Sequence, residues 1–115
     1  MVVPYIQVVQ QNGVTACVKH FALNNQEKWR RHINVELSFR ALYEINLPAF
    51  KAAVVEGKVW TIMGMLNQIK GEYACRNKLT LNKILKGERK FDGCDITDWG
   101  EAHKCTDACP KIFNW

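Results

Sequence analysis

The chain has 115 residues, of which 48% are hydrophobic and 23% charged, and its net charge is +5. This length indicates a single domain covering residues 1–115, and the absence of any run of 18 apolar residues excludes a predicted transmembrane helix. The first residues, MVVPYIQVVQQNG, lack a basic segment followed by an apolar one, so we expect neither a signal peptide nor a membrane partner.

The charge is a weak indication of nucleic-acid binding, because the basic residues are scattered. The one dense basic group is KWRRH, residues Lys28 to His32, and no helix-turn-helix or RNA-binding signature accompanies it. We therefore expect no nucleic-acid partner, although a basic interaction module built on this group stays a minor alternative.

The five cysteines are odd in number and irregularly spaced, which favours reduced thiols and a cytoplasmic location. Cys17 and Cys94 lie within apolar runs and are predicted to be small buried side chains. The tail from His103 to Cys109 offers histidine, cysteine and aspartate, but it lacks the paired cysteine spacing typical of zinc. We expect no metal and no other cofactor.

The first element in chain order is a buried strand over residues 14–22, VTACVKHFA, which is mostly apolar and begins with β-branched residues. A long polar segment, LNNQEKWRRHINVE, follows and is a candidate functional loop. A helix is predicted next, with Ser38 as its cap and with Leu42 and Ile45 on its apolar face. Pro48 should interrupt or restart this helix, and Gly57 should follow its end.

A second buried strand is predicted over residues 58–66, KVWTIMGML, followed by a loop that turns at Gly71. A short helix over residues 80–86 and a third strand over residues 93–98, GCDITD, complete the pattern. The alternation of strands and helices predicts an α/β fold in which the strands pair in parallel through right-handed crossovers.

Polar or chemically distinctive residues stand at the carboxyl end of each predicted strand, where parallel α/β sheets bind their ligands. The residues concerned are Lys19 and His20 after the first strand, Met63, Gly64 and Asn67 after the second, and Asp98 and Trp99 after the third. Because neighbouring parallel strands end at one rim, we expect these side chains to converge there. Each residue alone has an ordinary interpretation: Asp98 as a helix N-cap, His20 as a hydrogen-bonded half-buried histidine, Lys19 as a solvated strand end, Met63 as core and Trp99 as packing.

Four motifs in order, VKHFALNNQE, INVELSFRALYEINLPAFKAAV, MGMLNQIKGEYAC and FDGCDITDWG, resemble the barrel domain of glycoside hydrolase family 3, in its β-glucosidase branch. The resemblance extends from about Gly13 to His103. It implies that the chain is part of a (β/α)8 TIM barrel, with about three parallel strands and two or three helices, and that this part bears the nucleophile.

The resemblance also implies roles for six residues. Asp98 matches the catalytic nucleophile; Lys19, His20 and Arg30 match groups that bind sugar hydroxyls; and Met63 and Trp99 match residues that line the first sugar subsite. A retaining glycosidase needs such a carboxylate to attack the anomeric carbon, and a second carboxyl group about 5 Å away as acid and base. Lys19 would help to keep Asp98 ionised, and an indole offers a flat apolar floor to a sugar ring.

The sequence departs from the family pattern in ways that bear on activity. A complete barrel has eight strands and normally more than about 200 residues, and in this branch a second domain usually supplies the acid/base glutamate. Leu66 stands where the family commonly has an aromatic residue, and Asp95 replaces an aliphatic one. By strand alternation Asp95 points at the helix layer, where its charge needs a partner. The final CPKIFNW is also unlike the family, which suggests a gene fragment.

Glu27, Glu72 and Glu101 follow the three strands and are geometrically possible substitutes for the acid. His32 lies near the position of a catalytic histidine in another branch, but Arg30 stands where its aspartate partner would be, so we interpret His32 as coincidental.

We therefore predict retaining hydrolysis of terminal β-D-glucosides with Asp98 as nucleophile, and a carbohydrate substrate as partner. The alternative is an inactive barrel remnant that binds sugar or associates with itself. Because the lone parallel strands would leave open sheet edges, we expect a homo-oligomer or a partner chain to cover them.

Overall fold

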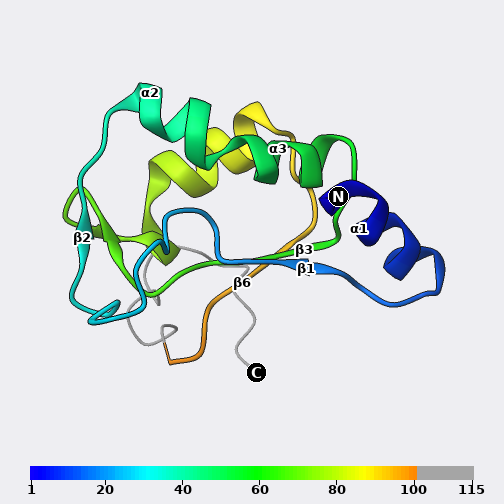
Figure 1. Cartoon of the computed structure of the whole chain (residues 1–115), viewed down its shortest axis with the longest axis horizontal. Helices are drawn as coiled ribbons and strands as arrows, with labels where there is room; N and C mark the ends of the chain where they lie inside the picture. The colour runs from blue at the N-terminus through cyan, green and yellow to red at the C-terminus, as the bar shows by residue number, and fades with distance from the viewer. Residues whose placement is uncertain (101–115) are drawn as a thin grey trace.

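Three short parallel strands form the main sheet in the order β1-β3-β6: β1 (Cys17–Val18), β3 (Thr61–Met63) and β6 (Cys94–Ile96). The computed structural model describes residues 1–100. These strands lie within the three predicted apolar runs, and their parallel pairing confirms the predicted α/β arrangement. In Figure 1 all three run in the same direction, so their carboxyl ends reach the same end of the molecule.

A second, smaller sheet joins the loops that follow β1 and β3, and the sequence analysis did not predict it. Its strands are β2 (Asn34–Val35), β4 (Gln68–Ile69) and β5 (Glu72–Tyr73), with β2 parallel to β4 and β4 antiparallel to β5. Lys70 and Gly71 form the two-residue turn between β4 and β5, with φ angles of 50° and 83°. Two successive positive φ angles are typical of a tight hairpin turn, which agrees with the turn predicted at Gly71.

The segment between the two sheets is helical and has a break at the predicted place. It consists of α2 (Phe39–Ala41), a π-helical turn η1 (Leu42–Asn46) and α3 (Pro48–Val55). Ser38 caps its start, because Ser38 Oγ accepts a 3.1 Å hydrogen bond from the Ala41 backbone N–H. Pro48 occupies the first turn of α3, where its missing N–H costs nothing.

The π-helical turn explains an error in the predicted apolar face. Leu42 is buried as expected, whereas Ile45 is 76% exposed. The Leu47 N–H donates to Leu42 O over 2.9 Å, a five-residue span that places more residues in the turn than an α-helix has. The prediction for Ile45 was wrong because it assumed α-helical rotation throughout.

Two further helices lead from the second sheet to β6. They are η2 (Ala74–Arg76) and the π-helical η3 (Leu79–Glu88), and η3 contains the predicted helix over residues 80–86. Asn77 precedes η3 and its Oδ1 accepts a 3.0 Å hydrogen bond from the Thr80 N–H, which fixes the start of this helix. The helix α1 (Val2–Gln11) at the beginning of the chain was not predicted.

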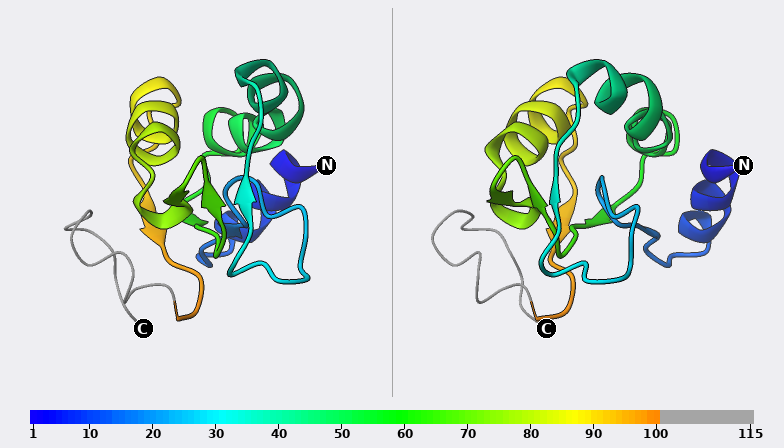
Figure 2. Two further views of the ribbon diagram at one scale, coloured as in Figure 1. Left: turned by 90° about the vertical axis from the view of Figure 1, so that its left-hand side faces the viewer. Right: turned by 60° about the vertical axis from the view of Figure 1, so that its left-hand side comes forward.

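The helices α2, α3 and η3 lie together on one side of the main sheet, and the core fills the space between them (Figures 1 and 2). The largest fully buried apolar side chains are Ile6, Leu23, Leu47, Ile62, Met65, Leu66, Ile69, Ile84 and Leu85. Ile62 is the central residue of the central strand and is 1% exposed. A sheet covered by helices in this way holds the carboxyl ends of its strands in fixed relative positions.

Cys17 and Cys94, which were predicted to be buried, lie on the two edge strands of the main sheet. Cys17 is exposed and Cys94 is only half-buried, so the predicted burial was wrong for Cys17 and incomplete for Cys94. Both residues lie on the outer strands, β1 and β6, which have no strand beyond them among residues 1–100. Both cysteines are free thiols.

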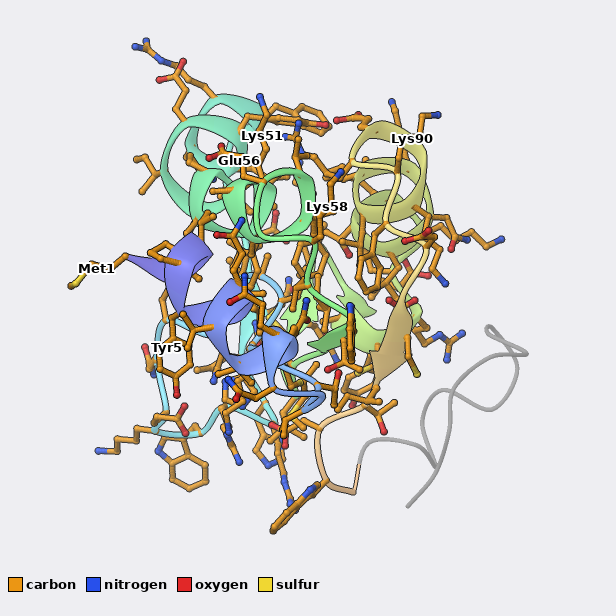
Figure 3. The ribbon with its side chains drawn as sticks, turned by 90° about the vertical axis from the view of Figure 1, so that its right-hand side faces the viewer. Met1, Tyr5, Lys51, Glu56, Lys58 and Lys90 are labelled. Atoms are coloured by element: carbon orange, nitrogen blue, oxygen red, sulfur yellow. The ribbon has the colours of Figure 1, made fainter. Side chains whose placement is uncertain are left out.

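At the other end of the molecule from the strands' carboxyl ends, α1 exposes apolar side chains. Met1 and Tyr5 project from it in Figure 3, and Tyr5 is 73% exposed. Within residues 1–100, none of the helices has the length and apolar character needed to cross a lipid bilayer.

Candidate active site

Asp98 lies two residues beyond β6, at the carboxyl end of the main sheet, and only 8% of the residue is exposed. Its Oδ1 accepts a 2.7 Å hydrogen bond from the backbone N–H of Trp99. Its Oδ2 is buried and has no hydrogen-bond partner in the described part of the chain. A buried carboxylate oxygen without a donor is unfavourable, so this atom has an unfilled requirement that a ligand can meet.

A histidine and an arginine face this oxygen. His20 Nε2 and Arg30 Nη1 each lie 3.6 Å from Asp98 Oδ2. At this distance the contacts are electrostatic, because an aligned hydrogen bond would be shorter. The structure thus brings together three of the predicted site residues, His20, Arg30 and Asp98, from the ends of β1 and β6 and from the polar loop.

The polar loop that carries Arg30 is held by its own hydrogen bonds. The Arg30 N–H donates to Glu27 O over 3.2 Å, and the His32 N–H donates to Trp29 O over 2.7 Å. At the end of the loop, the Gln68 N–H donates to Ile33 O over 2.8 Å and so joins it to the second sheet. Arg30 Nη1 also lies 3.2 Å from Glu27 Oε2, so one guanidinium nitrogen contacts two carboxylates.

Met63 ends β3 and is half-buried, next to the chain that leaves β1. Its carbonyl accepts a 2.8 Å hydrogen bond from the Phe21 N–H, which fixes the backbone directly after His20. Gly64 follows, and its N–H donates to Ile96 O over 2.8 Å, so β3 and β6 stay paired up to the site. A Cβ at Gly64 would lie 2.9 Å from Cys75 Sγ, which explains the glycine at this strand end.

Lys19 and Trp99 lie on the outside of the site. Lys19 is exposed and takes part in none of the ion pairs found in residues 1–100. The cation that contacts the Asp98 carboxylate is therefore Arg30, joined by His20 when it is protonated. Trp99 is 85% exposed, so its indole faces solvent and packs little against the described part of the chain.

Asn67 is a buried polar residue close to the loop that follows β1. It is 2% exposed, and its Nδ2 donates to Leu23 O over 3.3 Å while its Oδ1 has no partner within residues 1–100. Leu66, directly before it, is 1% exposed and belongs to the core. The aliphatic side chain at position 66 therefore serves packing in this chain.

Asp95 lies on β6 on the side of the helices, as strand alternation predicts. Lys86 of η3 forms an ion pair with Asp95 Oδ2, which supplies the partner that the buried charge requires. Neither Asp95 oxygen makes a hydrogen bond of acceptable geometry in the described residues, so the contact is an ion pair by proximity and charge. The side chain of Asp95 is 11% exposed and that of Lys86 33%.

Two features of the site were not predicted. Glu27 and Arg30 are three residues apart in the sequence, so their ion pair could have been predicted from this spacing. Trp29 is 68% exposed beside Arg30, and nothing in the sequence pattern distinguishes it from a buried tryptophan.

Other predictions concern residues beyond the described part. Within residues 1–100 no group of three histidine, cysteine or acidic side chains is placed to hold a metal ion, and the tail from His103 to Cys109 lies outside these residues. Glu101 also lies outside them. The interpretation of Asp98 as an N-cap stays a prediction, because the segment after Gly100 is not described.

Comparison with known proteins gives a consistent result. The model of the glycosyl hydrolase family 3 N-terminal domain matches residues 1–111. The beta-glucosidase BoGH3A of Bacteroides ovatus is 67% identical over 106 residues, which cover 92% of this chain and 14% of that protein. An exo-alpha-(1->6)-L-arabinopyranosidase of Bifidobacterium longum is 42% identical over 98 residues, covering 85% of this chain and 13% of that protein.

Among solved structures, beta-glucosidase 3B from Thermotoga neapolitana in complex with glucose superimposes with a TM-score of 0.82 at 40% identity. The match covers 84% of this chain and 14% of that structure, and it confirms the predicted partial barrel. The chain spans about one seventh of the length of these relatives. The family model and the identities together establish that this chain belongs to glycosyl hydrolase family 3, as part of its N-terminal domain.

Proposed function

We propose that this chain carries the nucleophile-bearing part of a retaining β-glucosidase that hydrolyses terminal β-D-glucosides, with Asp98 as the nucleophile. The observation that carries the proposal is the buried Oδ2 of Asp98 at the carboxyl end of β6, which has no hydrogen-bond partner among residues 1–100 and is faced by His20 and Arg30. The chain belongs to a family in which proteins similar to it are named β-glucosidases, and this supports the hydrolysis of glycosides as the reaction.

In the first step an Asp98 Oδ2 lone pair attacks the anomeric carbon, and the bond from that carbon to the leaving oxygen breaks with its electrons on the oxygen. In the second step water attacks the same carbon and releases a proton to solvent, the sugar–Asp98 ester bond breaks, and the electrons of that bond return to the carboxylate. Two inversions give net retention. His20 and Arg30 have donors on the same side as the reacting oxygen, where sugar hydroxyls would accept hydrogen bonds.

Lys19, Met63 and Trp99 complete the proposed sugar site in different ways. Lys19 and Trp99 are exposed, so they would contact the sugar from the solvent side of the site. Met63 is half-buried at the end of β3 and supplies an apolar wall. The proton donor of the complete reaction is not among these residues.

The test uses 4-nitrophenyl β-D-glucoside, because nitrophenolate leaves without a proton and the assay does not depend on the acid. We expect nitrophenolate release by the 115-residue chain, its loss in Asp98→Ala, and its retention in the control Asp92→Ala, whose side chain is exposed before β6. A 2-fluoro-β-D-glucosyl fluoride should label the chain, with the added mass on Asp98. Turnover that survives Asp98→Ala, or a label on another residue, would refute the assignment.

A second candidate function is an inactive barrel remnant that binds sugar or associates with itself. The specific observation in its favour is the pair of outer strands, β1 and β6, which have no neighbouring strand beyond them in residues 1–100. Sedimentation velocity over a range of concentrations distinguishes the two. A remnant of this kind predicts dimers or larger species and no nitrophenolate release, whereas a monomer that turns substrate over excludes it.

We also propose a cytoplasmic location, on the grounds of the odd, irregular cysteine set and the free thiols of Cys17 and Cys94. Fractionation of cells that express the gene, with antibody detection of the chain, tests this. Recovery in a secreted or periplasmic fraction would contradict it.

A further inference from the structure

The basic motif Lys28–His32 divides into an inner and an outer part. Arg30 turns inward to the Asp98 carboxylate and is half-buried. Lys28, Trp29, Arg31 and His32 are all exposed. One side chain of the motif therefore belongs to the proposed catalytic site. The other four, which we call the outer face, are exposed beside it and have no role in the hydrolysis proposed above.

Trp29 is fixed in an unusual backbone conformation. Its φ angle is 61°, in the left-handed region that an aromatic residue rarely adopts. The turn is held by the His32 N–H donating to Trp29 O and by the Arg30 N–H donating to Glu27 O. Because strained residues persist where the surroundings impose them, this conformation indicates a backbone held by the turn, and the indole that it carries is exposed.

The indole has an aromatic neighbour on one side. The Trp29 and His32 rings approach edge to face, with centroids 6.2 Å apart and an interplanar angle of 62°. At 68% exposure, most of the Trp29 surface still faces solvent. A flat aromatic ring can therefore stack on the indole without displacing any described side chain.

Arg31 links this outer face to the segment that follows the nucleophile. A Cβ built on Gly100 would lie 3.8 Å from Arg31 Nη2, so this guanidinium lies against the chain two residues after Asp98. Trp29 and Arg31 flank Arg30 in sequence, and Arg30 contacts Asp98. The outer face therefore lies beside the loop and the strand end that carry Arg30 and Asp98, and the leaving group of a bound glucoside would project past it.

Among residues 1–100, no carboxylate forms an ion pair with the cations of the outer face. Lys28 and Arg31 take part in none of the ion pairs found in residues 1–100, and the nearby carboxylate, Glu27, is already in contact with Arg30. His32 adds positive charge when it is protonated. A flat ring on Trp29 that carried a negative substituent would meet these cations.

We propose that the outer face formed by Lys28, Trp29, Arg31 and His32 is an aglycone site that selects aromatic leaving groups bearing a negative charge. The proposal rests on the proposed function, because it takes the sugar to be held at Asp98. Trp29 stacks on the aromatic ring, and Lys28 and Arg31 attract the charged substituent. His32 supports the indole edge.

The test compares two ligands that differ by one charge, 4-carboxyphenyl β-D-glucoside and phenyl β-D-glucoside, together with glucose. Binding to the 115-residue chain is followed by NMR of the tryptophan indole N–H groups, assigned with single Trp→Phe variants. We expect the carboxylated ligand to shift the Trp29 signal and to bind about two- to fivefold more tightly than the phenyl ligand. Salt should reduce this preference, and Trp60, at the amino end of β3, is the internal control.

Two variants and one control separate the contributions. Arg31→Gln should remove most of the preference for the carboxylated ligand, and Trp29→Asn should weaken both aryl ligands while leaving glucose binding unchanged. The control is Lys51→Gln, which removes an exposed cation on α3, in the helical layer (Figure 3). This variant should bind the carboxylated ligand with the same preference as the original chain. The backbone amide spectrum of each variant verifies folding.

The outcomes distinguish this proposal from the function on which it rests. The aglycone site would be overturned if the two aryl ligands bound with equal affinity, or if they shifted the Trp99 indole signal and not that of Trp29. Neither result would contradict the assignment of Asp98 as nucleophile. The proposal would also be overturned if polyphosphate shifted the Trp29 indole signal as much as the carboxylated glucoside does. That result would indicate a surface that binds polyanions in general. If no glucoside binds and no label forms on Asp98, both proposals fail.

Discussion

Arg30 connects the polar loop after β1 to the carboxylate of Asp98 after β6, with its Nη1 3.6 Å from Asp98 Oδ2. Arg30 lies in the crossover that follows β1 and Asp98 in the segment that follows β6, and these two strands are on opposite edges of the main sheet with β3 between them. The same nitrogen lies 3.2 Å from Glu27 Oε2. One cation therefore lies between the proposed nucleophile and a carboxylate of the loop.

The first prediction concerns the replacement of Arg30. Arg30→Gln removes the guanidinium that faces Asp98 and should weaken glucoside binding roughly tenfold, because a charged donor is lost from a partly buried site. Titration of phenyl β-D-glucoside by NMR measures the change. Arg76→Gln, an exposed arginine of η2, is the matched control and should bind normally. Unchanged affinity in Arg30→Gln would show that Arg30 does not contact the sugar.

Glu27 provides the second prediction, and the structure favours a positioning role for it. Its side chain is 71% exposed and contacts the guanidinium that also faces Asp98. An exposed ion pair of this kind contributes little, so Glu27→Gln should raise KM for 4-nitrophenyl β-D-glucoside by no more than about fivefold and leave kcat unchanged.

A proton donor would behave differently from a positioning residue. If Glu27 were the acid, Glu27→Gln would lower kcat for alkyl glucosides, whose leaving groups need a proton, far more than for the nitrophenyl substrate. Measuring both substrates with the variant decides between the two roles. A selective loss on alkyl glucosides would refute the positioning role.

The third prediction concerns the ion pair between Asp95 and Lys86. Lys86→Met leaves a carboxylate that is 11% exposed without its cation, and should lower the free energy of unfolding by about 1–3 kcal/mol. The partial exposure of Lys86 keeps the cost below that of a fully buried pair. The double replacement Asp95→Val with Lys86→Met should come within about 1 kcal/mol of the original chain, because an apolar pair suits the space between η3 and β6.

Urea denaturation of the two single variants and the double variant forms a double-mutant cycle for this pair. A coupling energy near zero would mean that Lys86 and Asp95 act independently and that the pair has no structural role. Leu81→Ala on the same helix is a control for simple loss of packing, and its effect should add to that of Lys86→Met.

The sequence predicts the main sheet and its helices well because their signals are local. Apolar runs around Ile62 and Ile96 indicate the strands, and Ser38 and Pro48 mark the helix start and break through their own backbone chemistry. The second sheet leaves no such signal, because strands of two residues have no periodicity to detect. Ile45 was misplaced because the π-helical turn depends on tertiary packing.

The sequence predicted those site residues that stand at the ends of parallel strands, because such strand ends lie close together. His20 and Asp98 meet as the parallel arrangement requires, and the expected partner of Asp95 exists, but its identity as Lys86 depends on how η3 crosses the sheet. Lys19 was expected beside Asp98 and is instead exposed, since Arg30 reaches the carboxylate from the loop. Contacts made by long side chains across loops depend on the loop's path, which the sequence pattern does not specify.

Tyr43 gives the last prediction, a pH dependence of stability. Its hydroxyl donates to Glu88 Oε1 and Oε2 over 2.8 and 3.0 Å. Desolvation by burial, followed by the hydrogen bond and the negative charge of Glu88, raises the pKa of Tyr43 above the ordinary 10.0, although Arg89 opposes this. The folded chain therefore holds the phenol proton more tightly than the unfolded chain does. The resulting stability is complete below pH 10 and is lost as the pH rises through the folded-state pKa.

Tyr43→Phe lacks both the proton and the hydrogen bond, so it should be less stable than the original chain at pH 8, by about 0.5–1.5 kcal/mol. Because only the original chain loses the Tyr43 contribution at alkaline pH, the difference between the two should narrow above pH 10. Urea midpoints measured from pH 8 to 11 test this, with Tyr5→Phe on the exposed face of α1 as the control. A difference that stays constant or widens over this range would mean that the phenol of Tyr43 is not held by Glu88 in solution.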